Sequence, residues 1–170
     1  MKMDSQLIGI IGKHILIANL IAADLEVAEP IRDHGVDLIV YRDGKKECEK
    51  GSRFEACPIQ LKTSTDEAFE VYRKYECFPQ LRIVYVWNVR NPKDAEFYCL
   101  TYLEAISVLK AMKGAQFSIL EEKGHWVTTK PSKALKKILK KDFQVKVPKD
   151  WPNKFGMTKS SMTVSETEAS

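Results

Sequence analysis

Two short apolar segments carry polar side chains that could take part in chemistry. Residues 36–41 (VDLIVY) contain the carboxylate of Asp37, and residues 58–62 (PIQLK) contain the amide of Gln60 and the amine of Lys62. We predict a buried β-strand for each segment, and because side chains alternate along a strand, Gln60 and Lys62 share one face. Polar groups in apolar strands are costly unless they are paired or functional. The three residues therefore indicate a site.

The elements predicted around these two strands are a mixture of helices and strands. Apolar periodicity, helix caps and turn residues place their boundaries. A β-branched and aromatic strand, residues 81–89, is predicted to be central, with Tyr85 and Trp87 in the core. The expected order is a helix from Ser5 to about Asp24, strands at 25–29, 36–41 and 58–63, a helix from Ser64 or Thr65 to about Glu76, strands at 81–89 and 95–101, a helix at 102–112 and a last helix at 133–141. This order predicts an α/β fold with a mixed central sheet flanked by helices.

The composition of the 170-residue chain, 44% hydrophobic and 29% charged, is typical of a soluble globular protein of one domain. The longest apolar segment, residues 7–25, is interrupted by polar side chains, and the first residues lack a signal-peptide pattern, so we expect no membrane partner and a cytoplasmic location. Four cysteines without a CxxC pair and three histidines argue against a zinc site or a disulfide framework. We expect one domain at 1–156, with a core at 12–114 and a basic extension at 123–156, and a disordered tail at 157–170; Pro148 and Pro152 indicate extended chain before that tail.

The C-terminal third of the chain is rich in lysine. Eleven lysines lie between residues 123 and 159 against two acids, Asp142 and Asp150, although the net charge of the whole chain is only +4. This distribution suits binding to the phosphate backbone of DNA, and a solvated helix face is the alternative. Trp126 and Trp151 flank the segment and are expected to anchor it, with stacking on bases as the alternative. The expected nucleic-acid contacts are Lys13, His14, Lys133, Lys136, Lys137 and Lys140.

The αβββαβ order, with an acid on the second strand and Gln-x-Lys on the third, resembles the PD-(D/E)XK nuclease superfamily. Segments 35–40 and 59–64 carry the resemblance, and 22 residues separate Asp37 from Gln60. The resemblance covers about residues 12–101 and corresponds to the variant in which glutamine replaces the second acid. It implies a restriction endonuclease-like αβββαβ core, followed here by a basic C-terminal helix, and Mg²⁺-dependent hydrolysis of phosphodiesters in DNA.

The resemblance also implies a role for each residue of the site. Asp37, Gln60 and the main-chain carbonyl of Leu61 would supply the hard oxygen ligands that Mg²⁺ (or Mn²⁺) prefers. Lys62 would lie beside the attacking water and the charged transition state. The alternative is an ion pair between Asp37 and Lys62 that serves only the fold, with Gln60 as a bystander.

The first helix departs from the family pattern. Active members commonly carry a glutamate there, and the matching position is Lys13, with no acid between Asp4 and Asp24. A lysine at this position opposes the binding of a metal cation. The alternative function is therefore a catalytically impaired nuclease-fold module that binds nucleic acid or a protein partner. A second copy of the chain, in a homodimer, is a further candidate partner. Residues that could replace the missing acid are Asp24, Glu29, Asp33 and His14.

Overall fold

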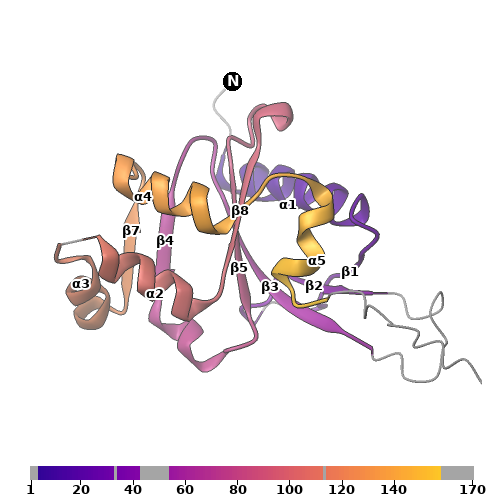
Figure 1. Cartoon of the computed structure of the whole chain (residues 1–170). Helices are drawn as coiled ribbons and strands as arrows, with labels where there is room; N and C mark the ends of the chain where they lie inside the picture. Colours follow the sequence, from indigo (N-terminus) through magenta and orange to yellow (C-terminus); the bar gives the residue numbers. More distant parts are fainter. Residues whose placement is uncertain (1–3, 33, 43–53, 113, 158–170) are drawn as a thin grey trace, which may run out of the picture.

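The computed structural model describes residues 4–32, 34–42, 54–112 and 114–157, so Asp33 and the predicted tail from residue 158 lie outside the described residues. Within the described residues, a six-stranded sheet with the order β1-β2-β3-β5-β6-β8 forms the centre. Strands β3 and β5 are parallel, and every other neighbouring pair is antiparallel. Helices cover both faces of the sheet (Figure 1). The predicted α/β class, with a mixed central sheet flanked by helices, is confirmed.

The strands and helices have the following bounds. The central sheet contains β1 (Glu26–Ala28), β2 (Leu38–Tyr41), β3 (Ala56–Thr63), β5 (Arg82–Trp87), β6 (Glu96–Leu100) and β8 (Gln144–Val145). A separate two-stranded sheet pairs β4 (Phe69–Tyr72) with β7 (His125–Thr128). The α-helices are α1 (Ser5–Ile21), α2 (Tyr102–Ala111), α3 (Gln116–Lys123), α4 (Lys133–Ile138) and α5 (Trp151–Lys154). None of the helices in the described residues is long and apolar enough to cross a bilayer.

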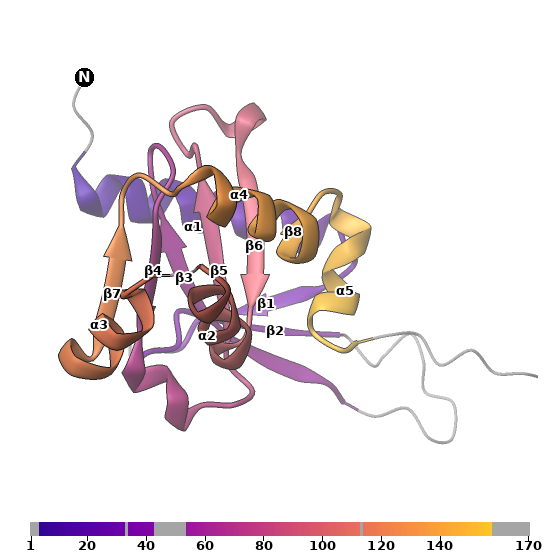
Figure 2. The same cartoon turned by 60° about the vertical axis from the view of Figure 1, so that its left-hand side comes forward.

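The central strand β5 separates two hydrophobic cores. Val84 and Val86 pack toward α1 and α5 on one face of the sheet. Tyr85 and Trp87 pack on the other face toward the β4–β7 sheet, α2 and α4, so the prediction that both are core residues is confirmed. Figure 2 shows α2 and α4 lying across the second face. Since successive side chains of β5 enter different cores, the strand is buried and largely apolar from Ile83 to Trp87.

Helix α1 packs on β3 through a glycine. A Cβ atom at Gly12 would lie 2.3 Å from Cγ2 of Thr63, so only glycine lets the helix approach the strand this closely. The helix is capped by the side chain of Asp4, which accepts a hydrogen bond from the backbone of Leu7, one residue before the predicted start at Ser5. This close approach brings Lys13 to the region of β3 where the predicted site residues lie.

The helix predicted from Ser64 or Thr65 to about Glu76, which is the second helix of the expected αβββαβ order, is wrong. The segment instead forms β4 and a 3-10 helix, Arg73–Cys77. Residues 69–72 (FEVY) alternate apolar and polar side chains, and strand β7 offers them a partner, so tertiary pairing overrides the helix-start signal at residues 64–67. Two buried rings of β5 also fix this strand, because Tyr85 Oη and Trp87 Nε1 donate to the backbone carbonyls of Glu70 and Ala68, both at 2.6 Å.

The end of the described chain is folded, contrary to the extended chain expected from Pro148. Helix α5 begins at Trp151, whose ring is fully buried, stacks on Phe155 and donates to Asn19 of α1. The anchoring role predicted for Trp151 is confirmed. Met157, the first residue of the predicted tail, is 1% exposed. The helix predicted at 133–141 is α4 followed by a π-helical turn, Leu139–Phe143, which ends where β8 joins the sheet.

Candidate functional site

Asp37 lies directly before β2 and beside the middle of β3. The pairing of Leu38 with Ile59 places Asp37 next to Gln60, and the backbone N–H of Asp37 continues the ladder by donating to the carbonyl of Ile59 at 2.8 Å. Gly35 has a φ of +93°, a conformation that glycine adopts without steric cost, and it turns the chain into this position. Strand β2 starts here while β3 continues to Thr63, so no other strand of the described residues pairs with this end of β3 on the β2 side.

The carboxylate of Asp37 covers this end of β3. Its Oδ2 accepts a hydrogen bond from the backbone N–H of Leu61 at 2.6 Å and a second one from Nε2 of Gln60. The same Nε2 lies 3.5 Å from the carbonyl oxygen of Leu61. Gln60 is only 8% exposed, so its amide would be costly in this position without partners. The structure therefore brings together Asp37, Gln60 and Leu61, and Gln60 is no bystander.

Lys62 forms its ion pair with a residue that the sequence did not indicate. Its Nζ lies 2.9 Å from Oε1 of Glu70 on β4 and 4.7 Å from the ring centre of Tyr72. Burial by itself would lower the pKa of Lys62, but the hydrogen bond and the charge of Glu70 outweigh it, so the pKa is raised. The ammonium group is therefore held charged, in a fixed position, beside Gln60.

Two cavities open on opposite sides of the contact between Asp37 and Gln60. The first, which we call the Lys62 cavity, has a volume of about 370 Å³ and is lined by Gln60, Lys62, Lys74 and Tyr75, with His34 and Phe78 at its rim. The second, the Lys13 cavity, has a volume of about 430 Å³, and Lys13, Asp37 and Leu61 contribute to its wall. Each cavity thus combines one residue of the hydrogen-bonded pair with a lysine.

Lys13 occupies the place on α1 where an acid was expected to complete the site. Its Nζ pairs with Oε2 of Glu29 at 2.9 Å, and its side chain lines the Lys13 cavity together with Asp37. Glu29 therefore neutralises this lysine, and no acid of α1 reaches the cavity among the described residues. His14, the neighbouring candidate, is exposed on α1.

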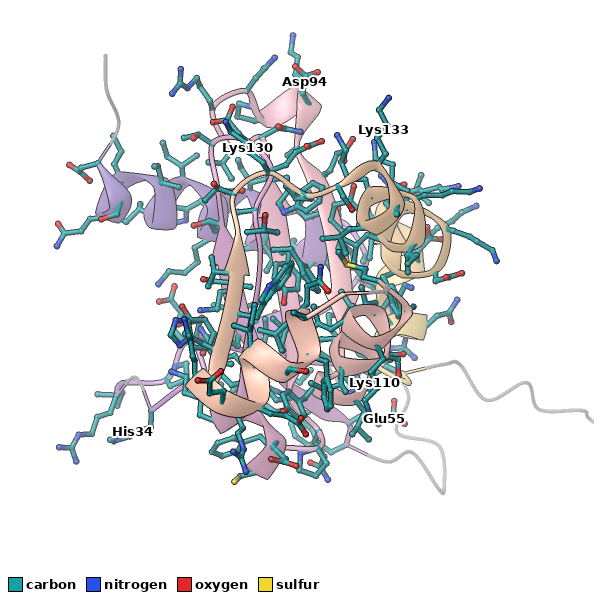
Figure 3. All side chains as sticks on the ribbon, turned by 90° about the vertical axis from the view of Figure 1, so that its left-hand side faces the viewer. His34, Glu55, Asp94, Lys110, Lys130 and Lys133 are labelled. Carbon is teal, nitrogen blue, oxygen red and sulfur yellow. The ribbon has the colours of Figure 1, made fainter. Side chains whose placement is uncertain are left out.

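Of the lysines predicted to contact nucleic acid on α4 and its continuation, two form ion pairs with the body of the protein and two are exposed. Lys136 pairs with Glu67 and Lys140 pairs with Glu96, each at 3.0 Å, so both tie α4 and its π-helical continuation to the body. Lys133 and Lys137 are exposed. Figure 3 shows Lys133 projecting outward at the end of the molecule opposite His34, so the basic helix lies away from the rim of the Lys62 cavity.

The residues of the site that sequence reasoning missed all follow β3 in the chain. Glu70, Lys74 and Tyr75 lie on β4 and the 3-10 helix, in the segment predicted to be one α-helix. The signal that could have found Glu70 is the two-residue alternation of residues 69–72, which puts Glu70 and Tyr72 on the same face of a strand.

Among the described residues, no group of three or more His, Cys, Asp or Glu side chains is placed to hold a metal ion. The oxygen atoms of Asp37 and Leu61 nevertheless converge on one point, and a nitrogen bearing two N–H groups occupies that point. Comparisons of the chain with models of known protein families, with curated proteins and with solved structures find no significant match.

Proposed function

We propose that this chain acts on the phosphodiesters of DNA and hydrolyses them with Mg²⁺ or Mn²⁺ at Asp37 and Gln60, in a restriction endonuclease-like core. The observation that carries the proposal is the position of Gln60 Nε2, which lies between Oδ2 of Asp37 and the carbonyl oxygen of Leu61. An N–H group occupies the point on which two oxygen atoms converge, and a cation favours the same surroundings.

The oxygen atoms available at this point are of the types that bind a hard divalent cation. A carboxylate oxygen, a main-chain carbonyl and the amide oxygen of Gln60 are the ligand types that Mg²⁺ accepts, and its remaining positions are commonly filled by water. Rotation of the Gln60 amide by half a turn would exchange its nitrogen for its oxygen at this point. Such an ion, when bound, polarises the scissile phosphate and lowers the pKa of a water molecule.

The protein's own residues would position and stabilise the reacting groups. Asp37 is held in place by the N–H of Leu61, so its carboxylate is already oriented. Lys62 is kept charged by Glu70 and shares the face of Gln60, where it stabilises negative charge that develops on the phosphate. Lys13 in one cavity and the exposed Lys133 and Lys137 on α4 would contact flanking phosphates.

An assay on supercoiled plasmid DNA tests the proposal. Purified protein should nick or linearise the plasmid with Mg²⁺ or Mn²⁺ and not with EDTA, and Asp37→Ala and Lys62→Ala should each abolish cleavage. Asp142→Ala and Lys110→Ala are matched controls, because both residues are exposed and lie outside the site. Cleavage that survives both Asp37→Ala and Lys62→Ala would exclude this mechanism.

A second candidate function is supported by Lys13. This lysine, paired with Glu29, stands in the cavity of Asp37 at the place of a second carboxylate, so Asp37 is left as a single acidic ligand and the binding of a metal is weaker. The chain would then be a non-catalytic module that binds nucleic acid or a protein partner through the same surface. Calorimetric titration with Mg²⁺ and Mn²⁺ distinguishes the two functions: heat of binding that Asp37→Ala removes supports the hydrolase, and no binding together with salt-dependent DNA affinity supports the module.

A further inference from the structure

The Lys62 cavity carries positive charge that the proposed metal site does not require. Lys74 lies on the 3-10 helix at the other side of the cavity, and its Nζ is 5.3 Å from the ring centre of Tyr75 and 5.6 Å from that of Tyr72. Lys62 lies over the same two rings, at 4.7 Å from Tyr72 and 5.9 Å from Tyr75. Two ammonium groups therefore surround one pair of tyrosine rings.

The charge of these two lysines is only partly balanced. Glu70 pairs with Lys62, but within the described part of the chain no carboxylate pairs with Lys74 and no acidic residue lines the cavity. Like charges held close together repel, and an anion between them removes the repulsion. Glu70 thus holds Lys62, and the N–H groups of Gln60 and Leu61 hold Asp37, so Lys74 is the cation of the cavity that is available to an anionic ligand.

Tyr75 provides a second, independent indication of a ligand. Its side chain is 1% exposed and lines the cavity, yet among the described residues its buried hydroxyl finds no acceptor, because the side chain that acts on it most is Lys62, whose ammonium group can only donate. Burial raises the pKa of this hydroxyl, and the charge of Lys62 together with a hydrogen bond from its amine offsets only part of that effect, so the group remains a neutral donor at ordinary pH. A buried donor without a partner is rare in folded proteins and is satisfied when a ligand supplies an acceptor.

We propose that the Lys62 cavity binds a phosphate group of a nucleic-acid strand through Lys62, Lys74 and the hydroxyl of Tyr75. Two cations and a neutral donor match the charge and the acceptor oxygens of a phosphate. Phe78 is 49% exposed at the rim, where its ring can stack on the adjoining base or sugar, which free phosphate lacks. The assignment of this phosphate to a nucleic-acid strand rests on the proposed function. The binding of phosphate in the cavity does not require that the protein be catalytically active.

The test measures binding without metal, so that it is independent of hydrolysis. Fluorescence anisotropy of a short labelled single strand of DNA, in EDTA and at several salt concentrations, should show weaker binding by Lys74→Gln and a salt slope smaller by about 0.7 to 1. Tyr75→Phe should weaken binding about tenfold without changing the salt slope, because it removes a hydrogen bond to a charged group and no charge. Matched controls are Lys110→Gln and Tyr102→Phe, which should bind like the wild type.

A second arm separates the two sources of phosphate. Calorimetry with inorganic phosphate reports on the site alone, and Phe78→Ala should weaken the binding of the oligonucleotide while leaving inorganic phosphate unaffected. If inorganic phosphate binds and the oligonucleotide does not, the assignment to a nucleic-acid strand is overturned. Unchanged affinity and salt slope in Lys74→Gln together with unchanged affinity in Tyr75→Phe overturn the site. Binding that depends on Lys74 in a protein that does not cleave DNA supports the phosphate site and contradicts only the hydrolase.

Discussion

The ammonium nitrogen of Lys62 lies 2.9 Å from Oε1 of Glu70, which joins the middle of the central sheet to the separate β4–β7 sheet. Both side chains are less than a third exposed, so each would be poorly solvated without the other. The pair fixes the direction of the Lys62 amine, and any role of Lys62 at the site depends on it.

Replacing Glu70 with glutamine should therefore destabilise the fold. We expect a loss of about 1–2 kcal/mol in the free energy of unfolding, between the values for exposed and for fully buried pairs. Urea denaturation measures the loss. In a double-mutant cycle, the effect of Glu70→Gln should shrink when Lys62 is already replaced by methionine, and additive effects would show that the two residues are not coupled.

Substitution of Gly12 by alanine should loosen the contact between α1 and β3. The new Cβ would lie 2.3 Å from Thr63, and relief of this overlap should cost about 1–3 kcal/mol. Gly9→Ala is the matched control on the same helix, because nothing lies within 4 Å of its Cβ position and alanine has the higher helix propensity. Thermal unfolding should show a lower Tm for Gly12→Ala and an equal or higher Tm for Gly9→Ala; equal losses in both would contradict the contact.

Removal of the Trp151 ring should be among the most damaging single changes. The side chain is fully buried against Phe97 and Phe155, so Trp151→Ala should cost about 3–5 kcal/mol. Trp126 is only partly buried on β7, and Trp126→Ala is expected to cost less. Chemical denaturation of both variants measures the difference, and equal costs would contradict the anchoring role of Trp151.

Stability should fall at alkaline pH because of buried thiol and phenol groups. Burial raises the pKa of Cys99 from 9.0 to about 12 and raises that of Tyr85 well above 10.0. The pKa of the Cys99 thiol is higher in the folded than in the unfolded protein, so the folded state keeps its full stability below the unfolded pKa and loses stability as the pH rises toward the folded pKa. For Cys99 this loss runs from about pH 9 to about pH 12. At pH 10.5 this amounts to about 2 kcal/mol for Cys99. Unfolding free energies of Cys99→Ala should therefore depend less on pH above 9 than those of the wild type or of Cys77→Ala, whose thiol is exposed.

Substitution of the exposed lysines of α4 should weaken DNA binding, whereas substitution of Lys136, which pairs with Glu67, should lower the stability of the fold. Removing Lys133 and Lys137 together should reduce the salt slope of DNA binding by up to about 2 and leave the Tm unchanged, since neither is buried. Lys136→Ala should instead lower the Tm slightly, because Lys136 holds Glu67 at 3.0 Å. A salt slope that is unchanged in the double variant would assign the lysine-rich helix to solubility.

Most of the central sheet could be predicted from the sequence, because its strands are recognisable from the residue types within each short segment. Residues 81–89 are rich in β-branched and aromatic side chains and residues 95–101 in apolar and aromatic ones, which identifies both as strands, and Gln60 and Lys62 stand out because their neighbours are hydrophobic. The β4–β7 sheet could not be predicted in the same way, because its partner strands are separated by more than fifty residues and α2 and α3 lie between them. Glu70 was missed for that reason, since its place beside Lys62 depends on the long-range pairing.

The hydrogen bond from Trp151 to Asn19 spans 132 residues of the chain and has a consequence for how the protein folds. During synthesis, α1 is made long before α5, so the core that the two helices share on one face of the sheet stays incomplete until α5 has been synthesised. Contacts this distant in sequence slow folding, because the ends of a long loop have to meet before they gain any interaction. We therefore expect a nascent chain stalled before residue 148 to expose apolar surface on α1 and to bind chaperones.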